Sequence, residues 1–141
     1  MQVINHVYPS FEQIGPLADD TTPGPIVMVN LVKFRDRAEY PDGRADDISG
    51  REAYMRYAAE MQPIVEGEGG RLLFSGDVNG LIIGEVEEPW DAVALVEYPS
   101  RAVFHRIATS PAVQAIGVHR HAGLAGQLLI LSNAVDLVPR R

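Results

Sequence analysis

The order in which strand-like and helix-like segments follow one another constrains this chain more than any other feature of its sequence. Residues 26–34 (IVMVNLVKF) are apolar on both alternating faces over most of their length, which predicts a buried strand. Ser49 and Glu52 form a capping-box signature, and apolar residues then recur at helical spacing. This pattern predicts a helix over residues 50–67.

The rest of the chain predicts three more strands and a second, broken helix. Strands are predicted over residues 71–78 and 92–98, with residues 81–86 continuing the first strand or pairing with it after an Asn79-Gly80 turn. A helical stretch broken at Ser110-Pro111 runs to about residue 122, and residues 127–132 form the last strand. The order β-α-β-β-α-β predicts an α+β, ferredoxin-like fold with a four-stranded antiparallel sheet and helices on one face.

Length and hydrophobic content favour a single domain. The chain has 141 residues, of which 46% are hydrophobic, and this supports one core but not two. We expect residues 1–24 to be an N-terminal extension, with a short helix after Ser10, and residues 25–141 to be the domain. The acidic, turn-prone segment 36–48 is long for a loop and is interpreted as a lid or rim.

Composition excludes several classes of protein. The absence of cysteine excludes thiolate catalysis, iron–sulfur clusters and cysteine zinc sites. A net charge of −7, with one lysine, disfavours a nucleic-acid surface. No secretory signal or membrane-spanning segment is recognised, so we expect a cytoplasmic protein that does not bind membranes. Dinucleotide and phosphate-loop motifs are also missing, and we expect no cofactor.

The most informative candidate site residues are polar side chains in apolar patterns. Asn30 lies in the predicted strand 26–34, where an unpaired amide costs about 1–3 kcal/mol. It is either a donor to a ligand carbonyl or oxyanion, or a satisfied core amide. Arg120 falls on the apolar stripe of its helix, so its guanidinium should point inward and meet an anion. Glu97 or a ligand carboxylate would supply that anion, and an internal ion pair is the simpler interpretation.

Other candidates each have a purely structural alternative. Trp90 is an aromatic wall of a site or a turn anchor, and buried tyrosines more often pack than catalyse. Histidine is a possible general base, but no spacing of histidines with carboxylates predicts a metal site. The predicted catalytic residues are Asn30, Glu97, His105 and Arg120, and the predicted substrate contacts are Tyr54, Arg71, Trp90, Tyr98 and His119.

Several short motifs along the chain resemble one family. These are Asn30-Leu31-x-Lys33-Phe34, Ser49-Gly50-x-Glu52-Ala53-Tyr54-x-x-Tyr57, Gly69-Gly70-Arg71, Gly76, Trp90-Asp91, Glu97-Tyr98-Pro99-Ser100-Arg101 with Phe104, and Ser110-Pro111 with Gln114. Together they are similar to the domain-of-unknown-function family DUF1330, over roughly residues 26–132. The resemblance implies a dimeric α/β barrel, in which two ferredoxin-like protomers pack their sheets face to face. The apolar second face of the predicted sheet independently indicates a homodimer.

The resemblance implies a pocket but no single chemistry. We expect a small anionic or carbonyl-bearing ligand, aromatic or polyketide-like, and possible reactions are cofactor-independent isomerisation, elimination or monooxygenation. The first alternative is a non-catalytic binding or structural homodimer. The second is a haem-handling protein, because a haem-degrading branch of the superfamily uses Asn, Trp and His, which Asn30, Trp90 and one of His105, His119 or His121 would match.

Overall fold

A four-stranded antiparallel sheet organises the chain, in the strand order β2-β3-β1-β4. The computed structural model describes residues 2–139. The predicted ferredoxin-like α+β fold is confirmed, because the two central strands are the first and third in sequence. The strands are β1 (Ile26–Phe34), β2 (Arg71–Asp77), β3 (Ala92–Tyr98) and β4 (Leu124–Ser132).

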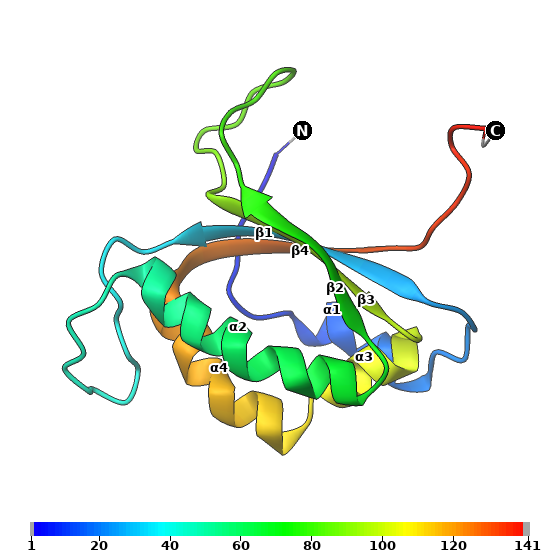
Figure 1. The fold of residues 1–141 in the computed structure, drawn as a ribbon, viewed down its shortest axis with the longest axis horizontal. Helices are drawn as coiled ribbons and strands as arrows, with labels where there is room; N and C mark the ends of the chain where they lie inside the picture. The colour runs from blue at the N-terminus through cyan, green and yellow to red at the C-terminus, as the bar shows by residue number, and fades with distance from the viewer. Residues whose placement is uncertain (1, 140–141) are drawn as a thin grey trace.

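The main helices all lie on one side of this sheet (Figure 1). Ser49, Ser100 and Ser110 each accept a backbone N–H in the first turn of the helix that follows, so all three starts are capped. A short helical segment after Ser10 is also present, as predicted. The helices are α1 (Phe11–Ile14), the 3₁₀ turn η1 (Gly15–Asp19), α2 (Gly50–Gly67), α3 (Arg101–Ala108) and α4 (Pro111–Gly123).

The core lies between the sheet and these helices. Ile26 and Leu124 are fully buried, and Tyr98 packs edge-to-face on Phe104 with 5.0 Å between ring centroids. Since side chains alternate along a strand, the face of β1 that carries Ile26 and Met28 also carries Asn30. Asn30 therefore points toward the helices.

Two glycines bring the start of α2 against the end of α4. A Cβ atom on Gly123 would lie 2.4 Å from the carbonyl oxygen of Gly50, so only glycine allows this approach. The Gly123 carbonyl accepts the backbone N–H of Arg35 at 2.8 Å, which ties β1 to the same point. This junction sets Tyr54, one turn into α2, and Arg120, one turn from the end of α4, on neighbouring helices.

The other face of the sheet has no helical cover (Figure 1). On this face, Val29 of β1 is the register partner of Leu95 of β3 and of Ile130 of β4, and all three point away from the helices. Phe74 of β2 continues the same row and is 54% exposed. This bare face consists mainly of apolar side chains, namely Val27, Val29, Leu31, Phe74, Val93, Leu95, Leu128 and Ile130.

Two predicted element boundaries are wrong. Residues 81–86 form no strand, and Ile82 and Ile83 are 96% and 92% exposed. The reason is that the Val78 N–H bonds to the Asp91 carbonyl, which pairs β2 directly with β3 and leaves the intervening residues as a projecting loop. β4 also begins three residues earlier than predicted, since Leu124 pairs with Phe34 beyond a bulge.

The N-terminal residues and the acidic segment 36–48, which lie outside the predicted strands and main helices, both contact the sheet or the helices. Near the N-terminus, His6 makes an isolated bridge to Gln127 of β4. The acidic segment 36–48 contains no helix or strand, as predicted, and it buries Tyr40 against α2 and α4. Among residues 2–139, no helix combines the length and hydropathy needed to cross a membrane.

Candidate functional site

A relay of three polar side chains crosses the space between α4 and the sheet. Arg120 donates through Nη1 to Gln127 Oε1 at 2.8 Å, and Gln127 Nε2 donates to Asn30 Oδ1 at 3.0 Å. Asn30 Nδ2 contacts the carbonyls of Met28 and Ala94, each at 3.3 Å. The amide of Asn30 is thus satisfied by the protein, and its part in the relay is to hold Gln127 in place.

Arg120 differs from the other basic side chains. Residues 2–139 contain ten lysine and arginine residues, and nine of them lie within 4.0 Å of a carboxylate oxygen. Arg120 is the tenth, and Gln127 is the one protein group in the described chain to which its guanidinium is hydrogen-bonded. A partly buried guanidinium with unused N–H groups and no carboxylate is prepared to bind an anion.

Three tyrosines lie on the helix side of the sheet, and the charge of Arg120 acts on two of them, Tyr54 and Tyr57. Desolvation raises the pKa of Tyr54 to about 12, although the positive charge of Arg120 acts in the opposite direction. Burial also raises the pKa values of Tyr57 and Tyr98. Within the described residues, no hydrogen bond joins these hydroxyls to another group of the protein. At neutral pH they are therefore protonated donors.

The residues on either side of Arg120 hold the two irregular segments in place. His121 Nδ1 shares a 2.7 Å hydrogen bond with the Tyr8 hydroxyl, and His119 Nδ1 shares one of 2.8 Å with the Tyr40 hydroxyl. Tyr8 comes from the N-terminal segment and Tyr40 from the acidic loop. Two phenol–imidazole contacts thus place both segments at the rim of the Arg120 site.

The predicted ion pair between Glu97 and Arg120 is wrong. Glu97 pairs with Val27 and Arg71 in the sheet register, so its side chain lies on the bare face, away from α4. There it accepts from Arg71 Nε at 3.1 Å. The sequence pattern showed that both residues interrupt apolar stripes but not that the sheet separates them.

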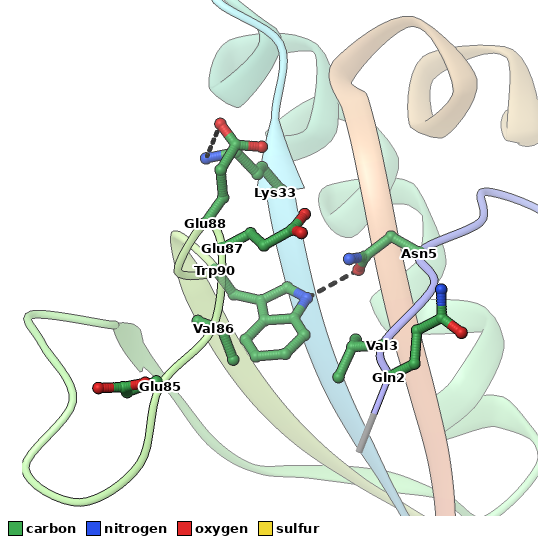
Figure 2. Close-up of a pocket in the computed structure, with 9 residues that line it drawn as sticks. All are labelled: Gln2, Val3, Asn5, Lys33, Glu85, Val86, Glu87, Glu88 and Trp90. Atoms are coloured by element: carbon green, nitrogen blue, oxygen red, sulfur yellow. Dashed lines mark hydrogen bonds and ion pairs between the residues drawn. The ribbon is translucent and has the colours of Figure 1, made fainter.

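Trp90 also lies on the bare face, apart from Asn30. Figure 2 shows Trp90, Asn5 and Lys33 in front of the sheet, with the helices behind it. The indole Nε1 donates to Asn5 Oδ1 at 2.8 Å and lines an open pocket of about 760 Å³ together with Glu87 and Lys33. The structure therefore does not bring Trp90 together with Asn30 and Arg120, although all three were predicted site residues.

The other predicted site residues also lie on different sides of the sheet. The structure gathers Asn30, Tyr54, Tyr98 and Arg120 on the helix side of the sheet. His119 lies at the rim, bonded to Tyr40. His105 lies in α3, and none of its side-chain contacts joins it to the relay. Arg71 stays on the bare face with Glu97.

Two residues of this site escaped prediction from the sequence. The sequence pattern places Gln127 in a strand but does not mark it as a site residue. Like Asn30, however, it is a polar residue beside apolar ones in a predicted strand. Tyr8 carried no signal, because its contact with His121 joins residues 113 positions apart. In the described part of the chain, no three histidine or carboxylate side chains are grouped to hold a metal ion.

Comparison with known protein families agrees with this description of the fold. A profile of a domain of unknown function, DUF1330, matches residues 43–134. No curated protein matches the chain significantly.

Solved structures include two of high similarity. The RPA0582 protein of unknown function from Rhodopseudomonas palustris is 33% identical, with a TM-score of 0.83 over 94% of this chain and 98% of that one. Methylated RPA0582 is 34% identical, with a TM-score of 0.85 over 94% and 97%. The At3g17210 protein of Arabidopsis thaliana, 13% identical, has a TM-score of 0.58 over 81% and 99%, and shares the fold alone.

Proposed function

This chain belongs to the DUF1330 family, and we propose that it is a homodimer in which each protomer binds a small planar anion or carbonyl compound at Arg120. One observation carries the binding part of this proposal. Arg120 is partly buried, has no carboxylate partner among the described residues, and sits in a protein with a net charge of −7. Carboxylates are plentiful along the chain, so an inward-facing arginine without one favours an external anion.

The surroundings of Arg120 favour a planar, aromatic ligand. The rings of Tyr54 and Tyr57 lie 5.7 Å apart between centroids at a tilt of 38°, and the Phe34 ring lies 5.6 Å from that of Tyr54. These rings provide an apolar wall, while the protonated hydroxyls and the guanidinium provide donors. A ring bearing a carboxylate, a phenolate or a conjugated carbonyl would satisfy both.

The same groups limit the chemistry. Arg120, Gln127 and Asn30 stabilise negative charge but do not accept a proton near neutral pH. Tyr54, with a pKa of about 12, is a poor base. An isomerase, lyase or monooxygenase reaction at this relay would therefore need a ligand that ionises readily by itself. The geometry supports binding more directly than catalysis, and no observation favours the haem alternative.

The bare sheet face supports the homodimer. An apolar row spans the four strands, from Phe74 through Leu95 and Val29 to Ile130, and its two ends, Phe74 and Ile130, are 54% and 45% exposed. Contiguous apolar side chains at a protein surface are typical of interaction sites. A second copy of the chain offers the same row, and two-fold symmetry lets the rows cover each other. The dimer would leave each Arg120 site on the outer side of its own sheet.

Binding is tested by titrating the protein with 2-naphthoate and following the fluorescence of the probe. We expect saturable binding to the wild type and a loss of affinity of about tenfold or more in Arg120→Gln, because one charge-assisted contact contributes about 1.5–3 kcal/mol. Arg106→Gln is the matched control, since Arg106 is exposed on α3 and paired with Glu68. Equal affinities for wild type and Arg120→Gln would contradict the proposal.

A further inference from the structure

Tyr8 makes contacts with Arg120 and His121 that resemble those of a bound ligand. The Arg120 guanidinium carbon lies 5.3 Å from the centroid of the Tyr8 ring, within the range of a cation–π contact. The Tyr8 hydroxyl reaches His121 Nδ1 at 2.7 Å, and the phenol and imidazole rings lie 5.6 Å apart at a tilt of 31°. One phenol thus contacts a guanidinium by its face and an imidazole by its hydroxyl.

The segment that carries this phenol is only lightly attached. In the N-terminal strap, which we define as residues 2–9, Ile4 is 61% exposed and Tyr8 57% exposed. Besides the Tyr8 contacts, the strap is held by the 3.3 Å backbone bond from His6 to Gln127 and by the Asn5–Trp90 bond. Few buried apolar contacts and an exposed backbone are the features of a segment that opens locally.

The strap also lies against both ends of the hydrogen bond between Arg120 and Gln127. His6 bonds to the backbone carbonyl of Gln127, the residue whose side chain receives the Arg120 guanidinium. Tyr8 covers one side of that guanidinium, while the charge of Arg120 acts on Tyr54 and Tyr57 within the core. Arg120 therefore lies between Tyr8 of the strap, on the outside, and the tyrosines Tyr54 and Tyr57, on the inside.

We propose that Tyr8 occupies the binding position of a hydroxyaryl ligand, so that the strap closes the Arg120 site with its own phenol until a ligand replaces it. The ligand class follows from what Tyr8 contacts. It is a phenol whose ring lies over the Arg120 guanidinium and whose hydroxyl bonds to His121 Nδ1. This inference rests on the proposed function, because it names the ligand class for the same arginine.

The test uses p-cresol, which reproduces the tyrosine side chain, and measures its affinity by NMR. Removing Tyr8 abolishes an internal competitor whose effective concentration is in the millimolar range or above, so Tyr8→Ala should bind p-cresol about tenfold more tightly than the wild type. The signals of the His121 imidazole should shift on binding. Because Tyr8 is exposed and outside the core, its truncation leaves the fold intact.

A second variant and a second probe separate the two contacts. Tyr8→Phe keeps the ring over Arg120, so it should exclude p-cresol as the wild type does. In Tyr8→Ala, 4-methylanisole, which has a ring but no O–H donor, should bind more weakly than p-cresol.

Equal p-cresol affinities for Tyr8→Ala and the wild type, or shifts that spare His121, would overturn the proposal for Tyr8. Such a result beside Arg120-dependent naphthoate binding would leave the anion site standing and remove only the role of Tyr8. If neither probe depends on its residue, both proposals are wrong.

Discussion

The two faces of the sheet use the same strands for opposite purposes. On the helix side, apolar side chains enclose a polar relay from Arg120 through Gln127 to Asn30. On the bare side, the register partners Leu95, Val29 and Ile130 form an apolar row that no helix covers. The difference follows from strand alternation, which places Asn30 and Gln127 under the helices and Val29, Leu95 and Ile130 on the opposite face. We proposed a ligand for the first face and a second copy of the chain for the other.

This difference also explains why the predicted site divides in two. Glu97 and Tyr98 are adjacent in β3, yet the Tyr98 side chain faces the helices and the Glu97 side chain faces the bare side. A shift of one residue along a strand moves a side chain to the other face. Residues that interrupt apolar patterns therefore share a site only when their positions in the register agree.

The largest expected effect comes from a charge placed on the bare face, which should weaken the proposed dimer. Val29→Asp should raise the dissociation constant of the dimer about 100-fold or more, because it loses the burial of a valine and places a carboxylate in an apolar contact. Sedimentation equilibrium measures this effect. Met55→Asp is the matched control, since Met55 is 60% exposed on α2, and it should leave the dimer unchanged. An unchanged dimer in Val29→Asp would contradict the role of this face.

The helix side is probed by alkaline titration. Unfolded Tyr54 releases its proton near pH 10, while the folded protein holds it to about pH 12, so proton release favours unfolding as pH rises through this window. We expect the wild type to lose up to about 3 kcal/mol of unfolding free energy through this residue, at about 1.4 kcal/mol for each pKa unit. Urea unfolding at several pH values measures the loss, which should be smaller in Tyr54→Phe. Identical pH profiles for both proteins would contradict the burial of this hydroxyl.

The smallest effect is expected when a residue on the bare face is substituted and ligand binding at the Arg120 site is measured. Glu97→Gln removes a charge from the bare side, and its affinity for 2-naphthoate should stay within about twofold of the wild type, as for distant, uncoupled sites. The fluorescence titration used for Arg120→Gln applies without change. A large loss of affinity in Glu97→Gln would mean that the sheet does not separate this carboxylate from the ligand.

The sequence predicted the elements well because their signals are local. The capping box at Ser49 and the apolar run over residues 26–34 each depend on neighbours within one or two turns of chain. The loop at residues 81–86 escaped prediction because its apolar residues have the composition of a strand, and only the Val78–Asp91 bond excludes them from the sheet.

The candidate site was predicted less well because it depends on distant partners. The inward orientation of Arg120 followed from its helical stripe and is confirmed by the bond to Gln127. Its partner did not follow, because Glu97 and Gln127 both interrupt apolar patterns and only the register decides between them. The assignment of site residues stays a prediction until ligand binding is measured.

Native mass spectrometry of the protein with 2-naphthoate tests both faces in one experiment. The account predicts a dimer that carries two naphthoate molecules, one for each Arg120, and an Arg120→Gln dimer that carries none. A monomer would contradict the role of the bare face. A dimer with a single naphthoate, or one whose binding does not depend on Arg120, would show that the ligand lies elsewhere than in the helix-side site.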